Sequence, residues 1–125
     1  MRKQYHFRKT ERGLLAWDVD RLVELSAGFE VLEVPLSEIV ELDQTFWFDH
    51  EGDEPTCRRI ALHAQLMLET DLAYPIILAQ DGRVMDGMHR VCKALIEERE
   101  TIRAVQFATD PEPDYADVPP DELPY

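Results

Sequence analysis

The sequence predicts an α+β fold in which a small mixed β-sheet is flanked by helices. Segments with apolar residues at helical spacing alternate along the chain with short apolar runs typical of strands. An Asp-Gly pair separates two of these runs, as in a β-hairpin. The 125 residues, of which 45% are hydrophobic and 31% charged, suit one globular domain rather than a disordered chain.

The charge balance limits the partners to be expected. The formal net charge is -13, so we expect no affinity for double-stranded DNA, whose binding depends on cationic side chains. Five bases lie within residues 1–12, whereas residues 109–125 carry six acids and no base. The basic arm is a candidate to touch RNA or an acidic partner, but we expect it to pair with the acidic surface of its own chain.

No membrane segment or secretory signal is predicted. No run approaches the ~18 apolar residues that a transmembrane helix needs, and no apolar core follows the basic N-terminus. Cys57 and Cys92 are far apart and form no CxxC pair. We therefore expect two reduced thiols and a cytoplasmic protein.

Residues 1–28 are predicted to be an N-terminal arm followed by a helix. No clear period marks residues 1–16. Asp18 is placed to cap a helix that runs to Ala27 and stops at Gly28.

A strand and a helical turn are predicted to open the core, which spans residues 29–108. Residues 29–34 have the composition of a strand and are followed by Pro35. Ser37 is placed to cap a short helical turn over residues 38–42.

An aromatic and acidic loop is predicted over residues 43–53. Its three adjacent aromatics, residues 46–48, either stack on a nucleobase or seal an edge of the core, and we favour the second. The neighbouring acids and His50 suggest a metal site with His63 or His89, but they match no known ligand spacing. We expect a solvated acidic loop, no metal site, and His63 as a boundary residue of the core.

The strongest helical pattern of the first half covers residues 55–70, with Pro55 in the first turn. Its apolar residues are predicted to face the core: Cys57, Ile60, Ala61, Ala64 and Leu68.

The second half is predicted as a hairpin, a helix and a strand. Residues 74–79 and 83–85 are the two hairpin strands, joined at Asp81-Gly82 by a type I′ turn. The last strand covers residues 101–107. The helix between them is predicted to bury Met88, Val91, Cys92 and Leu95.

Residues 109–125 are predicted to be an acidic, proline-rich tail, poorly ordered or extended over the surface. Tyr115, Leu123 and Tyr125 are its candidate anchors.

The turn between the returning strand and its helix is the candidate functional site. A helix N-terminus presents free N–H groups and the positive end of the helix dipole, and Gly87 permits close backbone approach. His89 and Arg90 add an imidazole and a guanidinium, so the turn is a candidate cradle for phosphate or carboxylate. The alternative is structural: Asp86 caps the helix and Arg90 pairs with a surface acid.

The run PIILAQDGRVMDGMHRVCKALIEERETIRAVQF resembles the core of the ParB/sulfiredoxin-like superfamily, in which a glycine and a His-Arg pair open a helix. The upstream run EVPLSEI and the helix over residues 56–68 follow the order used by such domains. The resemblance covers the predicted core and implies a ParB/sulfiredoxin-like fold. It also implies binding of ATP or CTP with Mg²⁺, with the phosphates at the helix N-terminus.

By this resemblance, Asp86 binds magnesium or acts as a general base, which makes it the candidate catalytic residue. The implied phosphate- and nucleotide-binding residues are Gly87, Met88, His89 and Arg90, with Thr56, Arg58 and Arg59 at the start of the preceding helix.

Departures from the family pattern count against two of the family's functions, sulfinic acid reduction and chromosome partition. Sulfiredoxins carry a cysteine where this chain has Met88, and a thioether cannot act as a thiolate nucleophile. Partition proteins usually carry Glu-Arg-Arg at the motif and a helix-turn-helix domain after it. The Asp-Gly-x-His-Arg form is closer to the small-molecule kinase branch. We therefore expect a nucleotide-binding domain, with small-molecule phosphotransfer as its candidate activity.

Two other functions stay open at this point. One is a non-catalytic adaptor that binds a protein through its acidic surface and tail. The weaker one is a nuclease, against which the net charge counts.

Overall fold

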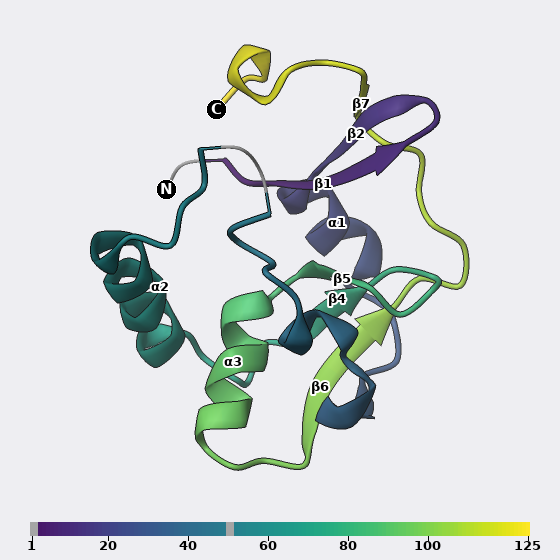
Figure 1. Cartoon of the computed structure of the whole chain (residues 1–125). Coiled ribbons are helices and arrows are strands. Elements are labelled where there is room, and N and C mark those ends of the chain that lie inside the picture. Colours follow the sequence, from purple (N-terminus) through teal and green to yellow (C-terminus); the bar gives the residue numbers. More distant parts are fainter. Residues whose placement is uncertain (1–2, 50–51) are drawn as a thin grey trace.

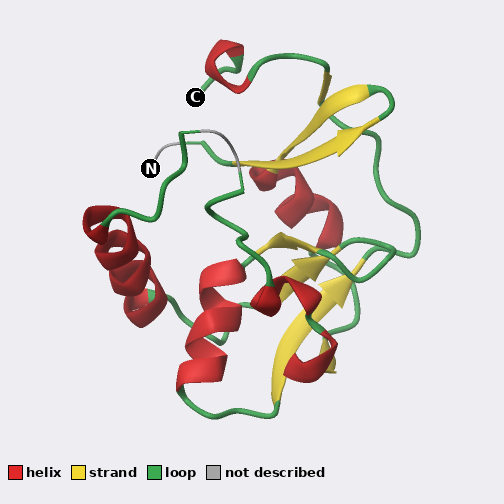
Figure 2. Cartoon of the chain, in the orientation of Figure 1, coloured by secondary structure: helices red, strands yellow, loops and turns green. Residues whose placement is uncertain are grey.

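The computed structural model describes residues 3–49 and 52–125. The described residues form three α-helices and two β-sheets, which confirms the α+β prediction (Figures 1 and 2). Short 3₁₀ turns at Leu36–Glu38 and Val40–Asp43 stand where one helical turn was predicted.

A four-stranded mixed sheet carries the core. It contains β3 (Leu32–Pro35), β4 (Ile76–Leu78), β5 (Val84–Asp86) and β6 (Thr101–Gln106), in the order β3-β6-β4-β5. β6 pairs antiparallel with β3 and parallel with β4, and β4 pairs antiparallel with β5. β3 begins later than predicted, and Pro35 is its last residue, which an edge strand tolerates.

The hairpin turn between β4 and β5 differs from the prediction. The N–H of Gly82 donates to the carbonyl of Ala79 at 3.0 Å, so the turn spans residues 79–82. Gly82 has a φ of +89°, whereas Asp81 is not in the left-handed region. The type I′ prediction, which needs two residues with positive φ, is therefore wrong. Asp81 instead stabilises the turn by accepting the N–H of Arg83 at 3.0 Å.

The core has one cluster on each face of this sheet because strand residues alternate between faces. One cluster is covered by α3 (Met88–Ile96) and the segment from Leu36, and it contains Ile76, Leu78, Val84 and Ala104. The other is covered by α1 (Val19–Ser26) and the N-terminal hairpin, and it contains Ile77, Met85, Val105, Leu22 and Trp17. α1 begins as predicted, with the Asp18 carboxylate accepting the N–H of Asp20.

The buried face of α3 is narrower than predicted. α3 buries Met88, Val91 and Ala94, so Leu95 is 53% exposed and Cys92 half-buried. The face against the sheet is narrow, and the small Ala94 lets the helix approach closely.

α2 (Cys57–Glu69) was predicted to bury its apolar stripe, and this prediction is wrong. None of its thirteen residues, all of them described, is fully buried, and Ile60 and Leu68 are 51% and 66% exposed. α2 lies beside α3 rather than on the sheet (Figure 1). Its half-buried residues are therefore His63 and Met67, one turn apart.

The N-terminal arm forms a hairpin that the sequence did not predict. β1 (Tyr5–Thr10) and β2 (Gly13–Asp18) pair antiparallel, and β7 (Tyr115–Ala116) of the tail adds a third strand beside β2. The tail is therefore fixed, and Leu123 is buried as one of its predicted anchors.

Ion pairs link the basic arm to the acidic tail, which confirms that the arm pairs with its own chain. Arg8 lies 3.2 Å from Asp110, and Arg12 lies 3.9 Å from Glu112. The tail also accepts a hydrogen bond from the indole of Trp17 at the carbonyl of Pro111, at 2.8 Å. Within the described ranges, every helix is too short or too polar to cross a membrane.

Candidate functional site

The turn after β5 needs glycine at position 87. Gly87 has a φ of +105° and a ψ of 22°, in the left-handed region, and α3 begins at the next residue. A Cβ built on Gly87 would lie 2.6 Å from Cγ2 of Ile76 and 2.8 Å from Nη2 of Arg90. The Arg90 guanidinium therefore lies directly against the backbone at the N-terminus of α3.

Asp86 and Arg90 form an ion pair across this turn. Nη2 of Arg90 donates to Oδ2 of Asp86 at 3.0 Å, and the two side chains are only 14% and 21% exposed. Asp86 does not cap α3, because Gly87 occupies the N-cap position and no side chain bonds there. Arg90 therefore pairs with an acid, as the structural alternative expects, but that acid is the largely buried Asp86 and not a surface residue. The capping role predicted for Asp86 is wrong.

His89 lies in a cluster of three stacked rings. Its Nε2 is 2.8 Å from Nδ1 of His63 on α2. The indole of Trp47 stacks on both imidazoles, with centroid distances of 4.3 Å to His63 and 4.5 Å to His89. Phe46 and Trp47 also pack against the core below α3, so the aromatic loop seals a core edge as predicted.

The two histidines are uncharged at neutral pH. Burial, and then the proximity of His63, lower the pKa of His89 to about 4. Burial also lowers the pKa of His63. One proton therefore bridges the two rings, and whichever ring donates it has an unprotonated nitrogen on its far side. The pair can take up a proton at one outer nitrogen and release one at the other.

Thr56 and Arg59 form hydrogen bonds at the start of α2 and not at the Gly87 turn. The Thr56 hydroxyl accepts the N–H of Arg59 at 3.2 Å, and the Arg59 guanidinium donates to the carbonyl of Gly52 at 2.7 Å. Arg58 is exposed. Thr56 precedes His63 by seven residues and Arg59 precedes it by four, so these residues lie about 6–10 Å further along the α2 axis than the histidine pair.

Lys93 fixes how α2 lies on α3. Its Nζ donates to the carbonyls of Leu68 and Thr70, at 3.2 Å and 2.5 Å, and so caps the C-terminus of α2 with a positive charge. His63 meets His89 one turn before Lys93, so the two helices run in the same direction. Their N-termini therefore point toward the same end of the molecule.

The acidic loop has no cluster of metal ligands in the part of the chain that the structure describes. Asp49 accepts a hydrogen bond from the Thr45 hydroxyl at 3.3 Å, and Asp53 lies 4.0 Å from Arg59. His50 and its acidic neighbour Glu51, two candidate ligands of this loop, lie outside the described residues.

No protein-family model matches the chain, and no curated protein or solved structure is significantly similar to it. The ParB/sulfiredoxin-like assignment therefore stays a prediction. At the site, Trp47, His63 and the turn at Gly87 come together from three separate segments of the chain.

Proposed function

We propose that the chain is a nucleotide-binding domain that holds phosphate groups at the Gly87 turn. The observation that supports this most strongly is the contact of the Arg90 guanidinium with Gly87, at the N-terminus of α3. Backbone N–H groups, the helix dipole and a fixed cation coincide there, which is the combination that binds phosphate.

The Asp86–Arg90 pair has a place in this proposal. A cation beside a helix N-terminus is unfavourable because it faces the positive end of the dipole. Asp86 offsets that cost when the turn holds no anion. A phosphate group would take over the role of Asp86, which would then be free to bind the Mg²⁺ of ATP or CTP or to accept a proton.

The other residues of the turn would play smaller parts. Met88 is buried, so it would offer only its backbone N–H. His89 is neutral and would contribute a hydrogen bond or a proton relay through His63, not a positive charge. Phosphotransfer to a small hydroxyl-bearing acceptor is the activity that this arrangement suits.

Thermal melting with and without Mg²⁺ and ATP, CTP or GTP tests the proposal. A nucleotide at 100 times its Kd stabilises the folded state by about 2.7 kcal/mol, which is a readable shift in Tm. The shift should disappear in Arg90→Ala and persist in Arg99→Ala, because Arg99 pairs with Glu97 on an exposed turn. No shift with any nucleotide, or an equal shift in both variants, would contradict phosphate binding at this turn.

Asp86→Asn separates the two roles of the aspartate. The amide keeps the shape and an acceptor for Arg90 but removes the opposite charge, so inorganic phosphate should bind more tightly than in the wild type. The additional stabilisation that Mg²⁺ gives with nucleotide should fall. Weaker phosphate binding in this variant would show that Asp86 supports the anion site in another way.

Protein binding is a second candidate function, and the exposed side of α2 favours it. The adaptor alternative uses the acidic surface and the tail, and part of that tail is paired with β2. α2 instead presents Leu62, Leu68 and their neighbours to solvent. We propose a second copy of this chain as its occupant, because Arg58 and Glu69 are eleven residues, about three turns, apart on one face. Antiparallel packing of two α2 helices would place each Arg58 beside the Glu69 of the other copy.

Sedimentation equilibrium of the wild type and of Leu62→Glu tests this candidate. A dimer that dissociates in Leu62→Glu, and persists in the solvent-facing control Glu98→Gln, is the expected result. A wild type that stays monomeric at millimolar concentration would exclude it.

A further inference from the structure

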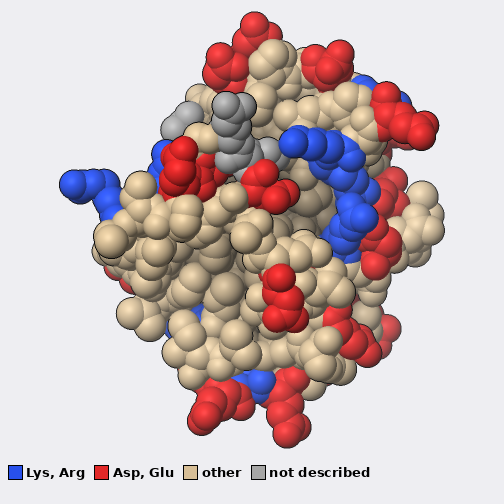
Figure 3. All heavy atoms as spheres, in the orientation of Figure 1, with Lys and Arg blue, Asp and Glu red and all other residues tan. Residues whose placement is uncertain are grey.

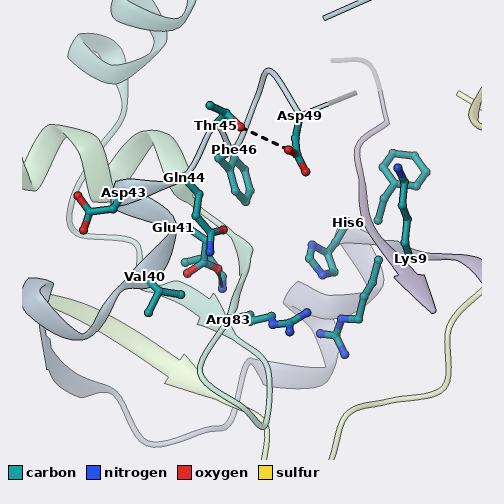
Figure 4. Close-up of a pocket in the computed structure, with 13 residues that line it drawn as sticks. His6, Lys9, Val40, Glu41, Asp43, Gln44, Thr45, Phe46, Asp49 and Arg83 are labelled. Atoms are coloured by element: carbon teal, nitrogen blue, oxygen red, sulfur yellow. Dashed lines mark hydrogen bonds between the residues drawn. The ribbon is translucent and has the colours of Figure 1, made fainter. Parts of the chain in front are cut away.

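A cleft separate from the Gly87 turn lies between β1 and the segment of residues 40–49. Its volume is about 770 Å³, and its floor includes the start of β5 at Arg83 and Val84. In Figure 4, Glu41 and Gln44 approach it from one side, and His6 and Arg83 lie across from them. Lys and Arg side chains line one margin of the hollow on this face of the molecule (Figure 3).

Unpartnered polar atoms are concentrated in this cleft. Across residues 3–49 and 52–125, four buried side-chain nitrogen or oxygen atoms lack a hydrogen-bond partner: Nε2 of His6, Nε and Nη2 of Arg8, and Oε1 of Glu41. All three residues line the cleft. A buried polar atom left without a hydrogen-bond partner is unfavourable, and more so when the group is charged. Their gathering in one place therefore indicates a site built for a polar ligand.

Arg8 presents a fixed anion fork. Its Nη1 donates to Asp110 at 3.2 Å, and its guanidinium carbon lies 5.0 Å from the centre of the Trp17 ring. Asp110 is itself fixed by the N–H of Gln80 at 2.7 Å. The two unpartnered N–H groups, on Nε and Nη2, lie on one edge of the guanidinium and match the two oxygens of a carboxylate.

Glu41 presents a buried acceptor. It is only 6% exposed, and its Oε2 accepts the N–H of Val84 on the edge strand β5 at 2.6 Å. The other oxygen, Oε1, is buried without a partner, and Glu41 is one of the residues that line the cleft. A hydroxyl or amide N–H of a ligand would donate a hydrogen bond to it. Such a bond is stronger in a buried position of low dielectric constant than at the surface.

We propose that this cleft binds a small organic carboxylate that also carries a hydroxyl group. The carboxylate would pair with the Nε/Nη2 edge of Arg8, and the hydroxyl would donate to Oε1 of Glu41. The three acids that line the cleft, Glu41, Asp43 and Asp49, are matched in number by three bases, Arg8, Lys9 and Arg83. A fully ionised phosphate group fits less well, because it has no hydrogen-bond donor for Oε1 of Glu41. This ligand is independent of the nucleotide proposed for the Gly87 turn, and the cleft shares none of the residues of that turn.

Titration of the full chain with matched pairs of carboxylates tests the proposal. The first pair is lactate and propionate, and the second is malate and succinate. Calorimetry measures the affinity for each compound, and inorganic phosphate is a further probe. In the wild type the hydroxylated member of a pair should bind at least tenfold more tightly. Glu41→Gln should remove this preference, and Arg8→Gln should weaken both members at least tenfold.

Arg12→Gln is the matched control, since Arg12 lies on the same hairpin, is exposed and does not line the cleft. If Arg8→Gln fails to fold, the Nε–H resonance of Arg8 in the wild-type protein reports the contact directly, because it should shift with carboxylate. Saturation by none of the four carboxylates, equal affinity within each pair, or a preference for phosphate would overturn the proposal. An Arg8 Nε–H resonance that does not shift when a carboxylate binds would overturn the proposal as well.

Discussion

Nδ1 of His63 and Nε2 of His89 lie 2.8 Å apart, so a single shared proton connects two parallel helices. The Trp47 ring covers this contact on one side. The pair therefore links the stability of the α2–α3 packing to pH.

Acid should destabilise the protein through this pair. His89 has a pKa of about 4 in the folded state and about 6.5 when unfolded. The unfolded state therefore binds the proton first, and the stability present above pH 6.5 is lost as the pH falls toward 4. His6, whose pKa burial also lowers to about 4, acts in the same direction.

Urea unfolding at pH 7 and pH 5 measures this effect. The free energy of unfolding should fall over this interval, and His89→Phe should make the fall smaller while keeping a ring beneath Trp47. A stability that does not change between the two pH values would contradict the lowered pKa of both histidines.

Trp47→Ala should uncover the histidine pair. The indole is half-buried, so its loss should cost about 2 kcal/mol, below the range for fully buried aromatics. Because burial is the main cause of the low pKa of His89, that pKa should rise toward 6.5. NMR titration of the imidazole resonances checks this, and Phe48→Ala is the control because Phe48 contacts only His63 within the described ring contacts.

Gly87→Ala should destabilise the fold by about 2–4 kcal/mol, since it combines a positive φ with a clash. The new methyl would meet Ile76 at 2.6 Å. Gly28→Ala is the matched control, because Gly28 is not at positive φ and nothing lies within 4 Å of the added Cβ. Chemical denaturation of both variants checks the difference, and equal stabilities would contradict the described turn.

Removal of residues 110–125 should expose the N-terminal hairpin. The truncation deletes β7, the Arg8–Asp110 pair and the acceptor of the Trp17 indole. Trp17 is only 2% exposed, so its fluorescence should shift to the red in a Trp47→Phe background. An unshifted spectrum would mean that the hairpin packs on the sheet without the tail.

Local patterns were enough to predict the second half of the fold. The segment from Ile76 to Gln106 combines short apolar strands with one amphipathic helix, and each boundary lies within a few residues of its prediction. The N-terminal hairpin was missed because its first strand, Tyr5–Thr10, mixes aromatic and basic residues without a clear alternation, and because its second strand pairs with a tail strand about a hundred residues away. Its one usable signal was Gly13, which takes a φ of +90° at the turn.

Only the part of the candidate site that is contiguous in sequence could be predicted. Asp86, Gly87 and Arg90 lie within five residues, so their meeting at one turn followed from the sequence. Trp47 and His63 join them from two other segments, and no spacing in the sequence reports that contact. The inward face of α2 was missed for a related reason, since the helix lies on α3 and not on the sheet.

Strand β2 takes one of its two partners from a segment that is very distant in sequence. It pairs with residues 115 and 116, about a hundred positions later, and the hydroxyl of Tyr5 bonds the carbonyl of Pro124. Contacts this distant in sequence slow folding, because the intervening chain must first be ordered. Until residues 115 and 116 are in place, the outer edge of β2 has unpaired backbone N–H and C=O groups. Such an edge is where a strand of another molecule can add to a sheet.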